Sequence, residues 1–138
     1  MDGNKSMLLF GGRKRLLADP QKLGRWGQRQ AERFLRRNGW RTVARNFAFG
    51  GGEIDLIAAD RNGTVAFVEV KTRRSEDYAP AVSSVTFGKQ QKLIRTAKCF
   101  LRQYDLSESP LRFDVITVIL PPSGPVQIRH YPGAFRPR

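Results

Sequence analysis

Carboxylates and an ammonium group stand inside two apolar stretches of this chain. The first stretch contains Glu53 and Asp55, and the second ends with Glu69 and Lys71. Side chains alternate between the two faces of a β-strand, so Glu53 shares a face with Asp55, and Glu69 shares a face with Lys71. Burying such charges costs roughly several kcal/mol per ion unless they are paired or bind a metal. We therefore expect these residues to carry a function.

The sequence between the two stretches determines how they pair. Residues 60–64, DRNGT, contain an Asn-Gly pair typical of β-hairpin turns. A two-residue turn would place Asp55 and Glu69 on opposite faces. A three-residue loop over 61–63, with Gly63 in the left-handed conformation, would instead place Asp55 directly across from Glu69, with Cβ atoms ~5 Å apart. We predict this loop or an equivalent bulge, because it lets both carboxylates bind one cation.

A divalent metal is the chemistry that this arrangement favours. Asp55 and Glu69 supply two carboxylates, the carbonyl of Val70 adds a neutral oxygen, and Glu53 can add negative charge. Hard oxygen ligands favour Mg²⁺ or Mn²⁺ over zinc. Such an ion polarises a phosphodiester and lowers the pKa of an attacking water, while Lys71 can orient that water or stabilise the developing negative charge. The alternative is a buried ion pair between Glu69 and Lys71 that closes a strand end.

Composition indicates one basic domain with an anionic partner. The 138 residues carry a net charge of +13, which favours nucleic acid as a partner over a role in solubility alone. We expect Arg73, Arg74 and Lys89, which flank the acidic residues, to hold phosphates. The single cysteine and the lack of an 18-residue apolar run predict a cytoplasmic protein without a membrane segment. Residues 1–18 are expected to form a mobile basic arm and residues 19–138 a single domain.

Hydrophobic periodicity predicts helices and strands in the order α-β-β-β-α-β. The expected elements are a helix from Asp19-Pro20 to Asn38-Gly39, a strand over 41–49, the hairpin, a helix over 87–104, a strand over 112–120 and an edge strand over 126–131 that frays from Pro132. This order predicts an α/β fold, with a central mixed sheet of four to five strands flanked by helices.

The motifs resemble a known family. Asp55 followed by Glu69-x-Lys71 resembles the PD-(D/E)xK nuclease signature, with Ile54 in the place of the proline. Together with the blocks GEIDLI, FVEVK and RFDVI, this signature resembles the YraN-like family over residues 24–135. The resemblance implies a restriction-endonuclease-like fold similar to archaeal Holliday-junction resolvases. It further implies a Mg²⁺-dependent DNA endonuclease, with branched or damaged DNA as candidate substrates and a homodimer as a candidate assembly.

One position departs from the family pattern. The first helix of the family usually carries a glutamate, an additional metal ligand in resolvase-like enzymes, where this chain has Gln28. Glu32, one turn further on, is the other helix acid that could approach the site. Because glutamine carries no charge, an alternative function is a catalytically silent nucleic-acid-binding module that keeps the nuclease fold. A third is an adaptor that docks on an acidic protein partner.

Overall fold

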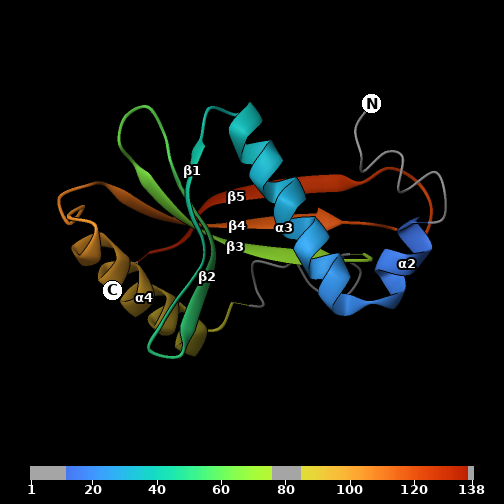
Figure 1. Cartoon of the computed structure of the whole chain (residues 1–138), viewed down its shortest axis with the longest axis horizontal. Helices are drawn as coiled ribbons and strands as arrows, with labels where there is room; N and C mark the ends of the chain where they lie inside the picture. Colours follow the sequence, from blue (N-terminus) through green and yellow to red (C-terminus); the bar gives the residue numbers. More distant parts are fainter. Residues whose placement is uncertain (1–11, 76–84, 137–138) are drawn as a thin grey trace.

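The computed structural model describes residues 12–75 and 85–136 of the chain (Figure 1). The elements are α2 (Gly12–Ala18), α3 (Pro20–Arg37), β1 (Arg41–Phe49), β2 (Gly52–Ala59), β3 (Val65–Arg73), α4 (Phe87–Gln103), β4 (Leu111–Ile119) and β5 (Gln127–Phe135). The five strands form one sheet in the order β1-β2-β3-β4-β5. Only β3 and β4 pair in parallel, joined through α4, so the sheet is mixed as predicted.

The two long helices begin and end where the sequence places their caps. The Asp19 carboxylate accepts hydrogen bonds from the backbone N–H groups of Gln21 and Lys22, and Pro20 opens α3. Gly39, with a φ of +88°, follows the end of α3. The Thr86 hydroxyl accepts from the backbone N–H of Lys89 at the start of α4. These local signals explain why the predicted bounds of both helices agree closely with the structure.

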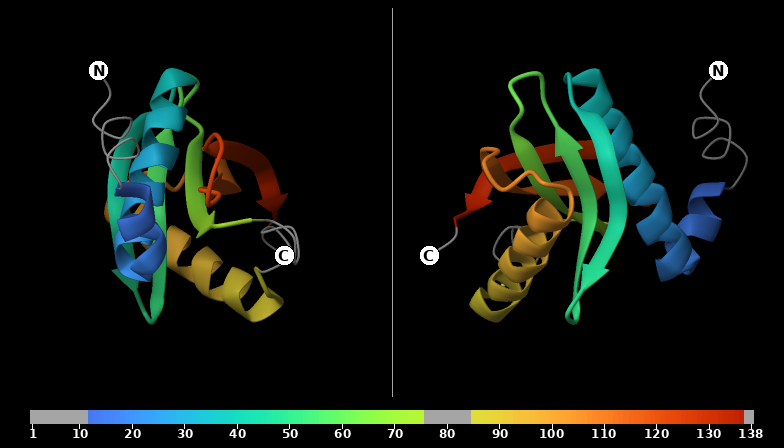
Figure 2. Two further views of the ribbon diagram at one scale, coloured as in Figure 1. Left: turned by 90° about the vertical axis from the view of Figure 1, so that its right-hand side faces the viewer. Right: turned by 60° about the vertical axis from the view of Figure 1, so that its left-hand side comes forward.

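Each long helix covers one face of the sheet (Figures 1 and 2). On one face α3 contributes Trp26 and Leu35 to a core that includes Leu56 and Val68 from β2 and β3. On the other face α4 packs Phe100 and its apolar neighbours against β2, β3 and β4. No helix of the described residues is long and apolar enough to span a membrane. The mixed α/β architecture expected from the sequence is confirmed.

The expected N-terminal arm is wrong for residues 12–18, which form α2. Leu16 is buried against α3, and the Arg13 guanidinium donates a hydrogen bond of 3.0 Å to the carbonyl of Pro121. The remainder of that arm, residues 1–11, lies outside the described residues. Burial of a single leucine and one long-range hydrogen bond are tertiary effects that the basic composition of this segment conceals.

The expected fraying from Pro132 is also wrong, because β5 continues to Phe135. The backbone N–H of Gly133 donates to the buried carboxylate of Asp114 at 3.0 Å. The Phe135 ring stacks on Phe113 with a centroid distance of 4.9 Å. Side chains of β4 therefore hold a segment whose proline and glycine would otherwise weaken a strand.

Candidate active site

The β2–β3 hairpin has the register that the carboxylate pair requires. Leu56 pairs with Val68 and Ala59 with Val65, and the Asp60 N–H donates to the Thr64 carbonyl at 3.1 Å. Residues 61–63 therefore form the loop, and Gly63 has a φ of +82°. This confirms the three-residue loop. Its consequence is that Asp55 and Glu69 are aligned across the two strands.

Asp55 lies where β2 and β3 stop pairing. Their ladder ends at Leu56 and Val68, and the released N–H of Val70 donates instead to the Asp55 carboxylate at 2.7 Å. The N–H and C=O of one residue in a strand point to the same side, so the Val70 carbonyl also points toward Asp55. The backbone thus brings the two oxygen donors expected from Asp55 and Val70 to one place.

A distortion of β1 and β2 directs Asp55 toward this position. Arg45 pairs with Leu56 and Phe47 pairs with Ile54, which leaves Asn46 across from Asp55. Asn46 has a φ of +52°, and Ile54 and Leu56 join the cores on opposite faces of the sheet. The strand therefore changes faces at Asp55, so the side chain extends along the sheet toward β3.

Glu69 is nearly buried between two lysines. Its side chain is 9% exposed, and Oε1 lies 2.6 Å from Lys89 Nζ and 3.2 Å from Lys71 Nζ. Burial, together with the neighbouring Lys89 ammonium, lowers the pKa of Lys71 from its ordinary value. Burial also opposes the charge of Lys89, but hydrogen bonds to Glu69 and Lys71 and the charges of Glu69 and Asp55 together outweigh burial and raise the pKa of Lys89. Lys71 is therefore the ammonium that gives up a proton more readily.

The surroundings of Asp55 disfavour its ionised form. Burial and the nearby negative charge of Glu69 raise its pKa to about 6, against the lowering effect of the hydrogen bond from Val70. Glu53 adds to this repulsion, although its own side chain is exposed. A bound cation at this position would relieve the repulsion that raises the pKa of Asp55.

The residues fit one hard metal ion better than several. Among residues 12–75 and 85–136, no three or more His, Cys, Asp or Glu side chains gather as a metal cage. Asp55, Glu69 and the Val70 carbonyl nonetheless match the ligand preference of Mg²⁺, which binds through one or two carboxylates and keeps several waters. Since Lys89 and Lys71 contact Glu69 Oε1, the other oxygen of Glu69 is the one left for a metal in this arrangement.

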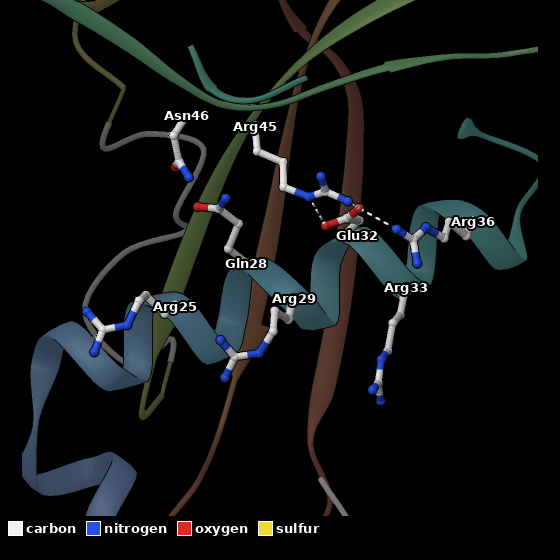
Figure 3. A pocket seen from close by; sticks show the side chains of 8 residues that line it. All are labelled: Arg25, Gln28, Arg29, Glu32, Arg33, Arg36, Arg45 and Asn46. Carbon is white, nitrogen blue, oxygen red and sulfur yellow. Dashed lines mark hydrogen bonds and ion pairs between the residues drawn. The ribbon is translucent and has the colours of Figure 1, made fainter. Parts of the chain in front are cut away.

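Helix α3 supplies no acid to this site. Glu32 is buried, but its carboxylate contacts Arg36, Arg45 and Thr42. Gln28 lines a separate pocket with Arg45, a pocket that neither Asp55 nor Glu69 lines (Figure 3). The possibility that Glu32 completes the site is therefore not realised in this structure.

The predicted phosphate-binding residues divide into two groups. Lys89 lies in the site itself, paired with Glu69, and it also lines a cavity of about 500 Å³ that Glu53 and Gly52 border. Arg73 and Arg74 are exposed beyond the end of the Glu-x-Lys segment. Sequence reasoning placed Lys89 only near the site, because a contact between residues 69 and 89 depends on how α4 packs.

Two further positions that shape the site were missed in the sequence. Asn46 adopts the left-handed conformation, which asparagine tolerates better than most residues, but nothing local requires it there. Gly27 lets α3 approach β3 closely, because a Cβ at this position would lie 1.9 Å from the hydroxyl of Thr72. A glycine inside a helical pattern was the one available signal.

The site and fold define a mixed α/β protein with a paired-carboxylate and lysine centre at the point where two sheet strands separate. The chain belongs to the uncharacterised protein family UPF0102, whose model matches residues 27–118. It is 42% identical over 115 residues to a UPF0102 protein of Trichlorobacter lovleyi, covering 83% of this chain and 91% of the relative. A UPF0102 protein of Symbiobacterium thermophilum is also 42% identical over 115 residues, covering 83% of this chain and 97% of the relative. The family expected from the sequence motifs is confirmed.

Proposed function

We propose that this protein is a Mg²⁺-dependent DNA endonuclease with a restriction-endonuclease-like PD-(D/E)xK core. The observation that carries the proposal is the convergence of Asp55, Glu69, Lys71 and the Val70 backbone where β2 and β3 separate. An acid pair beside a partly buried lysine suits phosphodiester hydrolysis, whose transition state concentrates negative charge. The net charge of +13 supports a polyanionic substrate.

In this proposal each residue has a separate task. Asp55, Glu69 and the Val70 carbonyl would hold the metal, which when bound polarises the phosphodiester and lowers the pKa of the attacking water. Lys71, whose pKa is lowered, orients that water or donates to the charged phosphate oxygens. Lys89, which pairs with the Glu69 carboxylate, would move from it to a substrate phosphate. Arg73 and Arg74 would position the backbone without reading bases.

The second candidate is a nucleic-acid-binding module that does not cut. The observation that favours it is the absence of an α3 carboxylate at the site, because Gln28 is neutral and Glu32 is held by two arginines. Lys71 and Lys89 already neutralise Glu69 without a metal. Such a module would bind nucleic acid through its basic surface and would bind divalent metal weakly.

Cleavage assays separate the two candidates. Labelled duplex, single-stranded and four-way-junction DNA would be incubated with Mg²⁺, Mn²⁺ or EDTA, using wild type, Glu69→Gln and Lys71→Ala. Glu108→Gln and Lys98→Ala, at exposed positions outside the site, are the matched controls. We expect metal-dependent cutting that both site variants reduce at least about a hundredfold and both controls retain. Absence of cutting by folded wild type on every substrate, with binding intact, would reject the nuclease in favour of the binding module.

A further inference from the structure

A second basic region lies between α3 and β1, apart from the candidate active site. Its pocket of about 520 Å³ is lined by Arg25, Gln28, Arg29, Glu32, Arg33 and Arg36 of α3 and by Arg45 and Asn46 of β1. We call it the arginine groove (Figure 3). Five arginines and a single carboxylate line the groove, so it is strongly positive. Such a concentration of like charge destabilises the folded state through repulsion, and an anionic ligand would relieve that repulsion.

Hydrogen bonds within the protein hold the side chains of the groove wall nearest β1 in place. Glu32, with a side chain only 9% exposed, accepts hydrogen bonds from Arg45 Nε at 2.9 Å and from an Arg36 nitrogen at 2.7 Å. Thr42 donates to the same carboxylate at 2.7 Å. The hydrogen bond from Arg45 outweighs burial and lowers the pKa of Glu32, so the carboxylate stays ionised. Glu32 thus acts as a positioning residue that orients two guanidinium groups.

The outer wall carries charge without protein partners. Arg25 and Arg29 are exposed and form no ion pair with any residue that the structure describes. They stand four positions apart on one helix face, a rise of about 6 Å. This spacing is comparable to that of successive phosphates along one nucleic-acid strand. Guanidinium groups also match phosphate oxygens in shape and donor number.

Two amide side chains also line the arginine groove, and one of them lies next to the candidate active site. Gln28 points toward Asn46 (Figure 3), and both line the groove. Asn46 lies across from Asp55, between the Arg45–Leu56 and Phe47–Ile54 pairs. One end of the groove is therefore one strand away from the carboxylate of the candidate active site.

We propose that the arginine groove binds the sugar-phosphate backbone of one nucleic-acid strand and leads it to Asp55. The binding part stands on the groove alone, and the direction toward Asp55 rests on the proposed function. Gln28, neutral where a metal ligand would be acidic, fits this role because an amide does not repel phosphates. Recognition would be through charge and backbone shape, without base reading.

Binding measured in EDTA tests the groove independently of cleavage. Fluorescence anisotropy would follow labelled duplex and single-stranded DNA of one length from 50 to 300 mM salt. The double variant Arg25→Gln/Arg29→Gln would be compared with Arg95→Gln/Arg102→Gln, which removes two exposed arginines of α4. Arg25→Lys/Arg29→Lys keeps the charge, and circular dichroism would verify folding of each variant.

We expect the groove variant to bind roughly tenfold to a hundredfold more weakly at 100 mM salt, and its slope of log K against log salt to be shallower by about 1 per arginine. The α4 control should change both quantities much less, and the lysine variant should retain most binding. Equal losses in the groove and α4 variants would overturn the proposal, as would displacement of DNA by an equal charge of polyaspartate. If the groove variant binds DNA more weakly but wild type cuts no substrate, the groove proposal stands and only the nuclease proposal is rejected.

Discussion

Replacing Asp55 with asparagine should stabilise the protein at neutral pH while removing the proposed metal ligand. The pKa of Asp55 is raised to about 6 in the folded state, from an ordinary value of 3.8, by burial and by Glu69. The folded state therefore binds a proton more tightly than the unfolded state, and stability falls as pH rises through this interval. Asparagine keeps an acceptor for the Val70 N–H but carries no charge.

The size of the gain follows from the pKa difference. A difference of about two units corresponds to about 3 kcal/mol at pH 8, where Asp55 is ionised in both states. The gain should shrink to about 0.5 kcal/mol at pH 4, where the folded carboxyl is already protonated. For a domain of this size the larger value raises the melting temperature by roughly 10 °C.

Chemical denaturation of wild type and Asp55→Asn in EDTA, at pH 4 to 8, measures this difference. Glu108→Gln, which removes an exposed acid, is the control and should show no comparable pH-dependent gain. Asp55→Asn that is no more stable than wild type at pH 8 would refute the argument. A gain of equal size at pH 4 and pH 8 would also refute it, because the cause would then be packing and not charge.

Two further predictions concern the residues that hold the elements in place. Burial alone would raise the pKa of Asp114, but hydrogen bonds from His130 and Arg112 outweigh burial and lower the pKa. The ionised carboxylate therefore stabilises the folded state at pH values above the pKa of Asp114 in the unfolded chain, and this stabilisation is lost as pH falls. Asp114→Asn should therefore cost about 2 to 4 kcal/mol at pH 7 in denaturant titrations, and a difference that persists unchanged at pH 3 would contradict this. Gly27→Ala should cost about 1 to 3 kcal/mol, since its Cβ would overlap Thr72, and Thr72→Ala in the same chain should recover part of the loss. A fully additive double variant would show that the two residues do not interact.

Local chemistry allowed several parts of the structure to be predicted correctly. The caps at Asp19 and Thr86 set the starts of α3 and α4, because a side-chain acceptor satisfies N–H groups only a few residues away. The Asn-Gly pair indicated a hairpin, and the requirement that Asp55 and Glu69 share a cation selected the three-residue loop over 61–63 that the structure has. In each case the interacting groups lie within a few residues of one another or are related by a two-residue period, so their spacing in the sequence predicts the interaction.

The same spacing misled where distant residues decide the outcome. The segment after Pro132 was expected to fray, yet Asp114 holds the N–H of Gly133, nineteen positions away. Glu32 was expected to be a helix acid that could approach the site, but the packing of α3 on β1 buries its carboxylate against Arg45. A pattern records which face of an element is apolar and does not record which charged group the neighbouring element presents.

The sequence by itself determined the acid pair, its lysine and the hairpin register that aligns Asp55 with Glu69. Only the tertiary structure decided that Lys89 reaches Glu69 and that the strands separate at Asp55 so that its carboxylate meets the N–H of Val70. It also decided that α3 brings arginines to β1 in place of an acid to the site. The physical reason is that hairpin pairing is set by backbone geometry over a few residues. The approach of a helix to a sheet is set instead by the whole buried surface, including close contacts such as that of Gly27 with Thr72.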